Sequence, residues 1–361
     1  DVIMNTSTDG IIQIGSDINQ MLFLEGYMTT DDIATSISIS NDGNRLAIGS
    51  HEESGGGTER GVVRVFEWDG LTWSQLGTSL NGVGNNDQFG QSVSLSSDGS
   101  RLAISSRYND DAATNAGHVR IFEWNGSSWN QLGSDIQGTN IDQLGYAVKL
   151  SDDGNTLVLS LDITYYTPTP EGTVKVYRWD GSSWNQLGSD LVGDTSSEEY
   201  GWAVDISENG NTIAIAATDG PNTSWRGRVE VFQWDGSAWG QLGSTLQGES
   251  TSDNSGFSIA LNKEGTRIAI GAPFNDGNGS NSGHARVYDW DGTTWNQLGS
   301  DIDGQAADDR FGFSIALSDD GDRVAIGSPQ NDTEGANAGQ VRIFDWNGTN
   351  WVQFGEDING E

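Results

Sequence analysis

Residues 311–328 read FGFSIALSDDGDRVAIGS, and residues 339–355 read GQVRIFDWNGTNWVQFG. The same pattern recurs along the chain with its glycines in register. The glycine of the first tight turn returns every 55 or 56 residues, at Gly43, Gly99, Gly154, Gly210, Gly265 and Gly321. A unit of this length with four β-like runs, repeated six times, predicts a β-propeller, in which small antiparallel sheets are arranged around an axis.

Each repeat contains four short apolar runs, which are clearest in residues 92–133. Strand A (92–96) and strand B (101–104) flank an Asp-Gly turn, and strand C (119–124) and strand D (129–133) flank an Asn-Gly turn. Such turns between alternating runs are typical of β-hairpins. The sequence therefore predicts an all-β propeller of six complete four-stranded blades at about 36–81, 91–138, 146–193, 202–248, 257–304 and 312–360.

Residues 1–35 form only half a repeat. Residues 11–18 (IIQIGSDI) match residues 295–302 (WNQLGSDI), which contain a D strand, and a further apolar run follows at 21–24. We interpret 1–35 as a closure or assembly segment and 36–361 as the propeller. In the alternative fold the segment supplies a partial seventh blade. Because an unpartnered strand edge must be covered, residues 1–30 are also predicted to mediate self-assembly by strand addition.

The charge balance excludes two classes of partner. The net charge is −35, with only 17 Lys and Arg residues. Such a surface repels phosphate backbones and anionic lipid, so we expect no nucleic acid and no membrane insertion. No apolar run approaches the roughly 20 residues that span a bilayer. The chain has no cysteine, which excludes disulfides and thiolate zinc sites.

Twelve of the fourteen tryptophans flank the C–D turns in pairs. Four residues separate the two members of each pair, so their rings are predicted to meet across the hairpin. Cross-strand aromatic pairs contribute roughly 0.5–1.5 kcal/mol beyond their burial. Six copies of one pair indicate a structural role.

Several segments resemble FG-GAP repeats. They are FGQSVSL (89–95), FGFSIAL (311–317), VAIGSP (324–329) and IAIGAP (268–273). FG-GAP repeats form the propellers of integrin α-subunit heads and of many secreted proteins of marine bacteria and algae. The resemblance covers roughly 36–355 and implies an extracellular location and recognition or adhesion without catalysis. Calcium-binding integrin repeats carry a long acidic A–B loop, whereas residues 96–100 form a tight turn, too short for six or more oxygens.

The first residue is Asp1 rather than Met, which indicates either a processed mature product or an excised segment, and secretion is the expected location. Six Asn-x-Ser/Thr sequons permit glycosylation in a eukaryotic secretory route: Asn5, Asn125, Asn222, Asn278, Asn331 and Asn347.

Three B–C loops share a pattern of Asn and Asp residues. The pattern comprises Asn109 and Asp110, Asn275 and Asp276 (with Asn278), and Asn331 and Asp332. Their side-chain oxygens could share a hard cation, Ca²⁺ above all. They could equally form Asx turns with their own backbone. No other cofactor is expected.

Aromatic residues on the variable loops are candidates for partner binding. Tyr165 and Tyr166 lie in one B–C loop, Trp225 lies in the next, and Trp202 follows a D–A connection. In an antiparallel blade the B–C loops and D–A connections share a face, so these side chains could bind a protein or glycan partner. Packing of the loops on each other explains them equally well.

Catalysis has little support in the residues. His118 and His284 occupy the same repeat position, and no nucleophile motif or phosphate-binding loop is present. We therefore expect a secreted, non-enzymatic module for extracellular interaction, adhesion or structure, including filament formation. The alternative is an extracellular carbohydrate-binding or carbohydrate-active enzyme that uses the variable loops.

Overall fold

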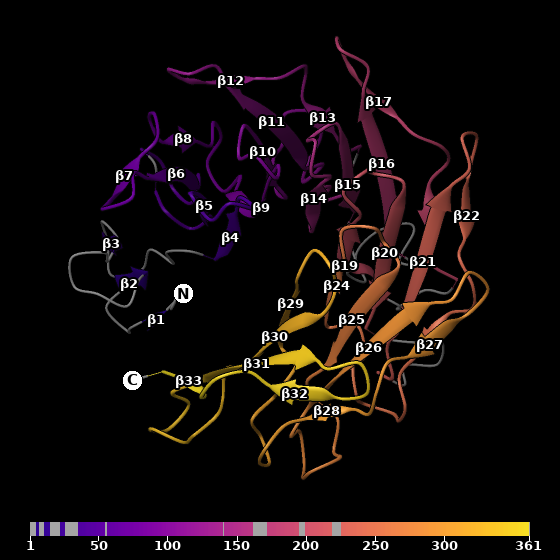
Figure 1. The fold of residues 1–361 in the computed structure, drawn as a ribbon. Helices are drawn as coiled ribbons and strands as arrows, with labels where there is room; N and C mark the ends of the chain where they lie inside the picture. Colours follow the sequence, from indigo (N-terminus) through magenta and orange to yellow (C-terminus); the bar gives the residue numbers. More distant parts are fainter. Residues whose placement is uncertain are drawn as a thin grey trace. The chain divides into compact units, whose positions relative to one another are not determined.

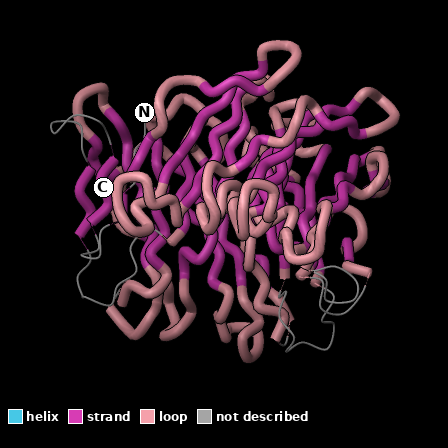
Figure 2. Tube along the Cα trace, turned by 90° about the horizontal axis from the view of Figure 1, so that it is seen from below, coloured by secondary structure: helices cyan, strands magenta, loops and turns pink. Residues whose placement is uncertain are grey.

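The structure is a computed structural model that describes residues 5–6, 11–14, 22–25, 35–54, 56–139, 141–161, 172–194, 199–218 and 225–360. Strands joined by turns and loops make up this part of the chain (Figure 2), and none of it is helical. Among the described residues, none forms a helix long and apolar enough to span a membrane. The fold is the expected all-β propeller, and each of the six described blades contains the four predicted antiparallel strands and a short fifth strand.

The chain divides into two compact units, whose strands are labelled in Figure 1. The first comprises Asp1–Asp162 and Lys175–Leu187, and the second comprises Ile163–Val174 and Gly188–Glu361. Blades 1 and 2 and most of blade 3 belong to the first unit, and blades 4, 5 and 6 belong to the second.

The strands of blades 1 to 3 follow one another in chain order. Blade 1 contains β4 (Ser36–Ile39), β5 (Arg45–Ser50), β6 (Val62–Trp68), β7 (Trp73–Gln75) and β8 (Leu80–Asn81). Blade 2 contains β9 (Phe89–Leu95), β10 (Arg101–Ser106), β11 (His118–Trp124), β12 (Trp129–Gln131) and β13 (Ile136–Gln137). Blade 3 contains β14 (Val148–Leu150), β15 (Thr156–Ser160), β16 (Thr173–Trp179), β17 (Trp184–Gln186) and β18 (Leu191–Val192).

Blades 4 to 6 repeat the same order. Blade 4 contains β19 (Tyr200–Ile206), β20 (Thr212–Ala217), β21 (Arg228–Trp234), β22 (Trp239–Gln241) and β23 (Leu246–Gln247). Blade 5 contains β24 (Ser258–Leu261), β25 (Arg267–Ala272), β26 (His284–Trp290), β27 (Trp295–Gln297) and β28 (Ile302–Asp303). Blade 6 contains β29 (Ser314–Leu317), β30 (Arg323–Ser328), β31 (Gln340–Trp346), β32 (Trp351–Gln353) and β33 (Ile358–Asn359).

A fifth, two-residue strand in each blade is the feature that sequence analysis missed. In blade 2, Gly133 has a positive φ of 79° and interrupts strand D. The chain then returns to the sheet, where Ile136 pairs with Val119 at the start of β11. This return places the residues after strand D beside the first residues of strand C.

The N-terminal segment forms a small sheet of its own. Strands β1 (Asn5–Thr6), β2 (Ile11–Ile14) and β3 (Leu22–Glu25) pair antiparallel in the order β1-β2-β3. The run at 11–18 that matches a D strand therefore contains β2, and the apolar run at 21–24 contributes to β3. A role of this segment in closure or assembly stays a prediction.

The tight A–B turns follow from their Asp-Gly sequence. In blade 2, Gly99 adopts a φ of 64°, a conformation that glycine adopts without the steric strain that a Cβ would cause. Asp98 Oδ1 accepts hydrogen bonds from Ser100 N (2.9 Å) and Ser96 Oγ (2.7 Å). The side chain thus satisfies the turn's backbone, and this contact holds the pKa of Asp98 below its usual value against the opposing effect of burial.

The core lies between neighbouring blades. Ala47, Val63 and Val65 of blade 1 pack against a cluster from blade 2 that comprises Phe89, Val93, Leu95, Leu102, Ile104 and Trp129. Each fully buried aliphatic or Phe side chain contributes about 1.5–3 kcal/mol. Similar clusters join blades 2 and 3, blades 4 and 5, and blades 5 and 6, so neighbouring repeats within each unit stabilise one another.

The tryptophan pairs meet across their hairpins, as predicted. Trp124 pairs directly with Trp129, and across the six pairs the ring centroids lie 5.3 to 5.6 Å apart. The pairs also contact the preceding blade. Trp129 Nε1 donates to Leu76 O (3.0 Å), and a Cβ on Gly77 would lie 2.8 Å from the Trp124 ring. The pairs of blades 2 to 6 each lie on the glycine that ends strand D of the preceding blade, namely Gly77, Gly133, Gly188, Gly243 and Gly299.

Candidate functional site

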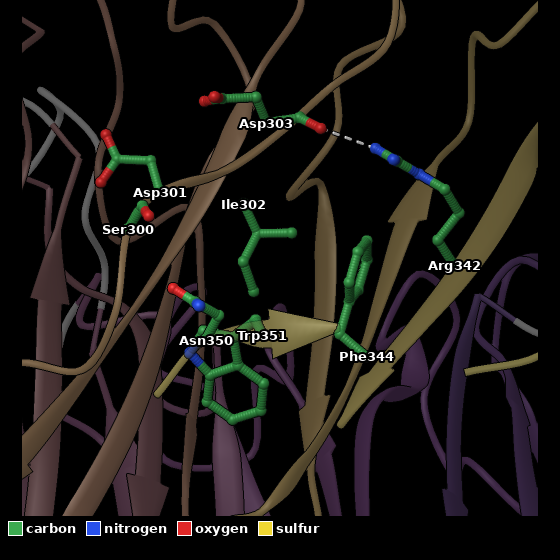
Figure 3. A pocket seen from close by; sticks show the side chains of 8 residues that line it. All are labelled: Ser300, Asp301, Ile302, Asp303, Arg342, Phe344, Asn350 and Trp351. Atoms are coloured by element: carbon green, nitrogen blue, oxygen red, sulfur yellow. Dashed lines mark hydrogen bonds between the residues drawn. The ribbon is translucent and has the colours of Figure 1, made fainter. Parts of the chain in front are cut away.

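A cleft of about 180 Å³ lies between blades 5 and 6 within the second unit (Figure 3). We call it the blade 5–6 cleft. Blade 5 supplies the run that ends in β28, and blade 6 supplies residues of β31 and of the C–D hairpin. The lining residues are Ser300, Asp301, Ile302, Asp303, Arg342, Phe344, Asn350 and Trp351.

The sheet geometry explains why these side chains meet. Arg342 and Phe344 are two residues apart on β31, so they project from the same face of blade 6. Trp351 opens β32 and is fixed by its indole N–H, which donates to Leu298 O of blade 5 (2.8 Å). The return of the chain into β28 brings Asp303 to the opposite wall.

Arg342 carries the positive charge of the cleft. Its side chain is only 6% exposed, and its guanidinium lies 4.2 Å from the Phe311 ring and 5.4 Å from the Phe344 ring. Nη2 donates to Asp303 O (2.7 Å), as Figure 3 shows, whereas Nε is buried with no hydrogen-bond partner. Burial lowers the pKa of Arg342, but an arginine remains charged. A buried donor without an acceptor can hold an oxygen of a ligand.

Two carboxyl groups of the cleft differ in acidity. Partial burial, together with the charge of Asp301, raises the pKa of Asp303. Hydrogen bonds from Arg286 hold the pKa of Asp301 below its usual value. Neighbouring carboxyls whose environments move their pKa values apart are typical of acid–base sites.

Two buried histidines at the same repeat position, which the sequence did not suggest as sites, each lie near two acidic side chains. In blade 2, Asp111, His118 and Asp135 approach one another, and in blade 5 His284 and Asp301 do so with Glu249, which lies in the connection between β23 and β24. Burial, followed by the nearby arginine, lowers the pKa of both histidines, that of His118 to about 4. The signal in the sequence is a His-x-Arg at the start of strand C followed by the Asp of a Gly-Ser-Asp-Ile motif.

The Asn and Asp residues proposed for calcium make the hydrogen bonds of Asx turns. Each first Asn accepts through Oδ1 from the backbone N–H two residues later, at Asp111 (3.0 Å), Gly277 (2.8 Å) and Thr333 (3.0 Å). Each following Asp accepts from the N–H five residues later. These bonds join Asp110 to Asn115, Asp276 to Asn281 and Asp332 to Asn337. Asn278 Nδ2 donates to Gly304 O. Calcium binding by these loops remains a prediction.

Trp202 belongs to an aromatic cluster of the second unit. Its ring lies 5.1 Å from Phe257, which in turn lies 4.7 Å from Phe313 and 6.2 Å from Phe274. We call these four residues the aromatic cluster. Phe313 is 37% exposed. The sequence did not suggest the cluster, although Trp202, Phe257 and Phe313 each follow the glycine that begins a blade.

Trp225, in the B–C loop of blade 4, is another of the expected partner-binding residues. Trp225 is 37% exposed, and its carbonyl accepts from Asn254 N (2.8 Å). Tyr165 and Tyr166 lie outside the described residues.

The sequons differ in accessibility. Asn125, Asn278 and Asn347 are exposed, whereas Asn331 is 3% exposed. Asn222 and the side chain of Asn5 lie outside the described residues. Glycosylation stays a prediction.

The FG-GAP repeat model matches three segments, at residues 81–122, 245–288 and 302–344. These segments cover most of strands A, B and C of blades 2, 5 and 6, and they confirm the resemblance. Propellers with FG-GAP repeats are typically protein-interaction modules. No curated protein matches the chain.

Solved structures share the fold over the whole chain. The periplasmic gluconolactonase PpgL of Pseudomonas aeruginosa has a TM-score of 0.63 at 14% identity, covering 100% of this chain and 95% of that one. A "putative 6-phosphogluconolactonase" of Bacteroides uniformis ATCC 8492 has a TM-score of 0.63 at 12% identity, covering 99% and 96%. Its counterpart from Bacteroides fragilis NCTC 9343 has a TM-score of 0.62 at 11% identity, covering 100% and 94%.

These neighbours overturn the prediction of a non-enzymatic module. They are named for lactonases, not for adhesion, structural or glycan-binding proteins. The prediction was wrong because it relied on the absence of a nucleophile motif. A cyclic ester is opened by water and a general base, which requires no such motif.

Proposed function

Since the chain carries FG-GAP repeats in a β-propeller, a fold that lactonases share, we propose that it hydrolyses a small, neutral sugar lactone in the blade 5–6 cleft. The observation that supports this most directly is the unpartnered Nε of Arg342 in a cleft that is also lined by Asp303, a residue whose carboxyl pKa is raised.

The chemistry needs two groups of the cleft. The lactone carbonyl oxygen accepts a hydrogen bond from Arg342, whose charge stabilises the oxyanion as it forms. Asp303 takes a proton from water, and the water oxygen bonds to the carbonyl carbon. The ring C–O bond then breaks, and the ring oxygen receives that proton from Asp303. The product is the open-chain hydroxy acid, and no cofactor takes part.

The charge of the protein favours a neutral substrate. The net charge is −35, and the carboxylates of Asp303, Asp309 and Asp357 lie close enough to Arg342 to affect its pKa. This field opposes the approach of a phosphorylated lactone. It also favours release of the anionic product.

Hydrolysis of glucono-δ-lactone, followed by acid release in a pH-stat at pH 6.5 and corrected for spontaneous opening, tests the proposal. Replacing a general base costs about 10²- to 10⁴-fold in rate, so Asp303→Asn should reduce kcat by that factor. Glu356→Gln, which changes an exposed carboxyl outside the cleft, should leave the rate unchanged. A wild-type rate equal to the blank, or an Asp303→Asn rate equal to that of wild type, refutes the assignment.

A second proposal concerns the loops. We propose that the aromatic cluster, with the neighbouring B–C loops and D–A connections, binds a protein partner outside the cell. Exposed Trp and Phe side chains on a rigid scaffold are typical anchors of protein interfaces. Phe313→Ser should weaken capture of extracellular proteins by the immobilised chain, and Phe354→Ser, which changes a half-exposed ring outside the cluster, should not. Equal capture by both variants contradicts the proposal.

Self-assembly through residues 1–30 remains a separate proposal. Deletion of these residues should abolish assembly, measured by sedimentation velocity, while the far-UV spectrum of the blades is preserved. A truncated chain that still assembles excludes the segment.

A further inference from the structure

The histidine cluster of blade 2 has no part in the proposed hydrolysis. His118 is the first residue of β11, Asp111 lies in the loop between β10 and β11, and Asp135 immediately precedes β13. One nitrogen of His118 and one oxygen of each carboxylate all lie within 4.8 Å of one another.

His118 is the residue that ordinary packing does not explain. It is 1% exposed, and neither Nδ1 nor Nε2 has a hydrogen-bond partner. Buried polar side-chain atoms nearly always have one, and the lone-pair nitrogen of an unpartnered neutral imidazole can bind a cation. The ring faces the carboxylates, with Nδ1 4.0 Å from Asp135 Oδ2.

We propose that Asp111, His118 and Asp135 bind a transition-metal dication, for which Zn²⁺ is the best chemical match. An imidazole nitrogen with two carboxylates suits zinc, whereas calcium and magnesium prefer all-oxygen sites. Three protein ligands leave a fourth position for water.

The geometry requires only small movements. Ligand atoms of tetrahedral zinc at bonds of about 2.1 Å lie about 3.4 Å apart, so the 4.0 Å between His118 and Asp135 must shorten slightly. Asp111 is 50% exposed and lies in a surface loop, so its carboxylate can approach. The burial of His118 keeps the ring neutral at pH 7, which leaves a lone pair for the metal.

Arg120 is a positive group that faces the cluster, and its charge acts on His118. Its Nε donates to Asp135 Oδ1 (3.0 Å) and its Nη2 to Asp135 Oδ2 (2.8 Å). When zinc takes Oδ2, the bond from Nε to Oδ1 can persist and orient the carboxylate, as groups outside a metal's ligand set commonly do. Asp87 adds a further negative charge near His118. The two ligand carboxylates and Arg120 leave one net negative charge to attract the cation.

In the cluster of His284, the acidic groups are paired with an arginine. Arg286 pairs there with both Glu249 and Asp301. In blade 2 the acid that comes from a loop is Asp111, at a different repeat position from Glu249, and Arg120 lies 3.8 Å from it, which is too long for a hydrogen bond. We therefore expect one zinc per chain, in blade 2.

Titration of ZnCl₂ into the untagged, EDTA-treated full chain by calorimetry at pH 7.5 tests the site. We expect one zinc per chain for wild type, at least tenfold weaker binding for Asp111→Asn, and loss of binding for His118→Gln. His51→Gln, which changes a histidine outside the cluster, should bind as wild type does. Co²⁺ in place of Zn²⁺ should give the visible absorption of a tetrahedral site in wild type.

Two results would overturn the proposal. The first is no zinc binding by wild type. The second is wild-type affinity in Asp111→Asn, which changes an exposed loop side chain and therefore remains informative even if His118→Gln fails to fold.

Discussion

Blades 2 and 6 place the same arginine in opposite settings. Three equivalent positions differ in one residue: blade 2 has His118, Arg120 and Asp135, and blade 6 has Gln340, Arg342 and Asp357. In blade 2 the arginine makes two parallel hydrogen bonds to the aspartate of its own blade. In blade 6 it makes none to Asp357 among the described contacts and donates to Asp303 O of blade 5.

The residue at the start of strand C explains the difference. A neutral, buried histidine donates no hydrogen bond to the aspartate, which therefore stays with the arginine. In blade 6 the Gln340 amide donates to Asp357 Oδ2 (3.2 Å), and Gln353 donates to Oδ1 (2.6 Å). Because both oxygens of Asp357 accept hydrogen bonds from glutamines, Arg342 pairs elsewhere and lines the cleft. We infer that the residue at the start of strand C determines whether the arginine two positions later pairs within its own blade or lines the cleft.

The largest expected effect comes from removing Arg342. Removing a group that stabilises an oxyanion costs about 10²- to 10³-fold, so Arg342→Gln should lower kcat for glucono-δ-lactone by that factor. Arg323→Gln provides the control, because Arg323 lies on β30 of the same blade and pairs with Asp345 at the surface. A rate in Arg342→Gln within twofold of that in Arg323→Gln would remove Arg342 from the reaction.

The histidine of blade 2 should make stability depend on pH. The pKa of His118 is about 4 in the folded state, against about 6.5 when unfolded. Between these values the unfolded chain binds more protons, so the free energy of unfolding falls as the pH drops from 6.5 towards 4. His118→Gln should remove up to about 3 kcal/mol of this dependence. Urea unfolding at pH 7 and pH 4.5 measures this change in the free energy of unfolding. An equal pH dependence in the variant and in wild type would show that His118 does not cause it.

Local features of this fold were predictable, because their contacts lie within one hairpin. The Asp98-Gly99 turn and the pair Trp124 and Trp129 each involve residues that are close in the sequence, so their contacts can be predicted from the sequence pattern. The cleft was not predictable in this way. Arg342 meets Asp303 across two blades, and its direction depends on which donor satisfies Asp357. The fifth strand of each blade escaped notice because two residues show no periodicity.

The seating of tryptophan pairs on glycine can be separated from the cost of backbone strain. Gly299 and Gly292 of blade 5 both have positive φ, at 79° and 97°. A Cβ on Gly299 would lie 2.9 Å from the Trp346 ring, whereas one on Gly292 would contact nothing within 4 Å. Overpacking typically costs about 1–3 kcal/mol, so Gly299→Ala should destabilise the protein by about 2 kcal/mol more than Gly292→Ala in chemical denaturation. Equal losses of stability in the two variants would mean that the positive φ, and not contact with the Trp346 ring, is the reason for glycine at position 299.

The smallest expected effect is the most direct test of the comparison between the two blades. Gln340→His gives blade 6 the His-x-Arg-Asp arrangement of blade 2. Without the Gln340 amide, Asp357 Oδ2 becomes available to Arg342, so part of the population should pair the two as Arg120 pairs with Asp135 in blade 2. A single hydrogen bond to a charged group is worth about 1.5–3 kcal/mol, so the new pair should lower kcat/KM by about tenfold.

Asp357→Asn in the same background removes the competing charge and should restore the rate. If Gln340→His leaves kcat/KM unchanged, the start of strand C does not direct the arginine, and the cleft must owe its charge to the packing of Arg342 against Phe311.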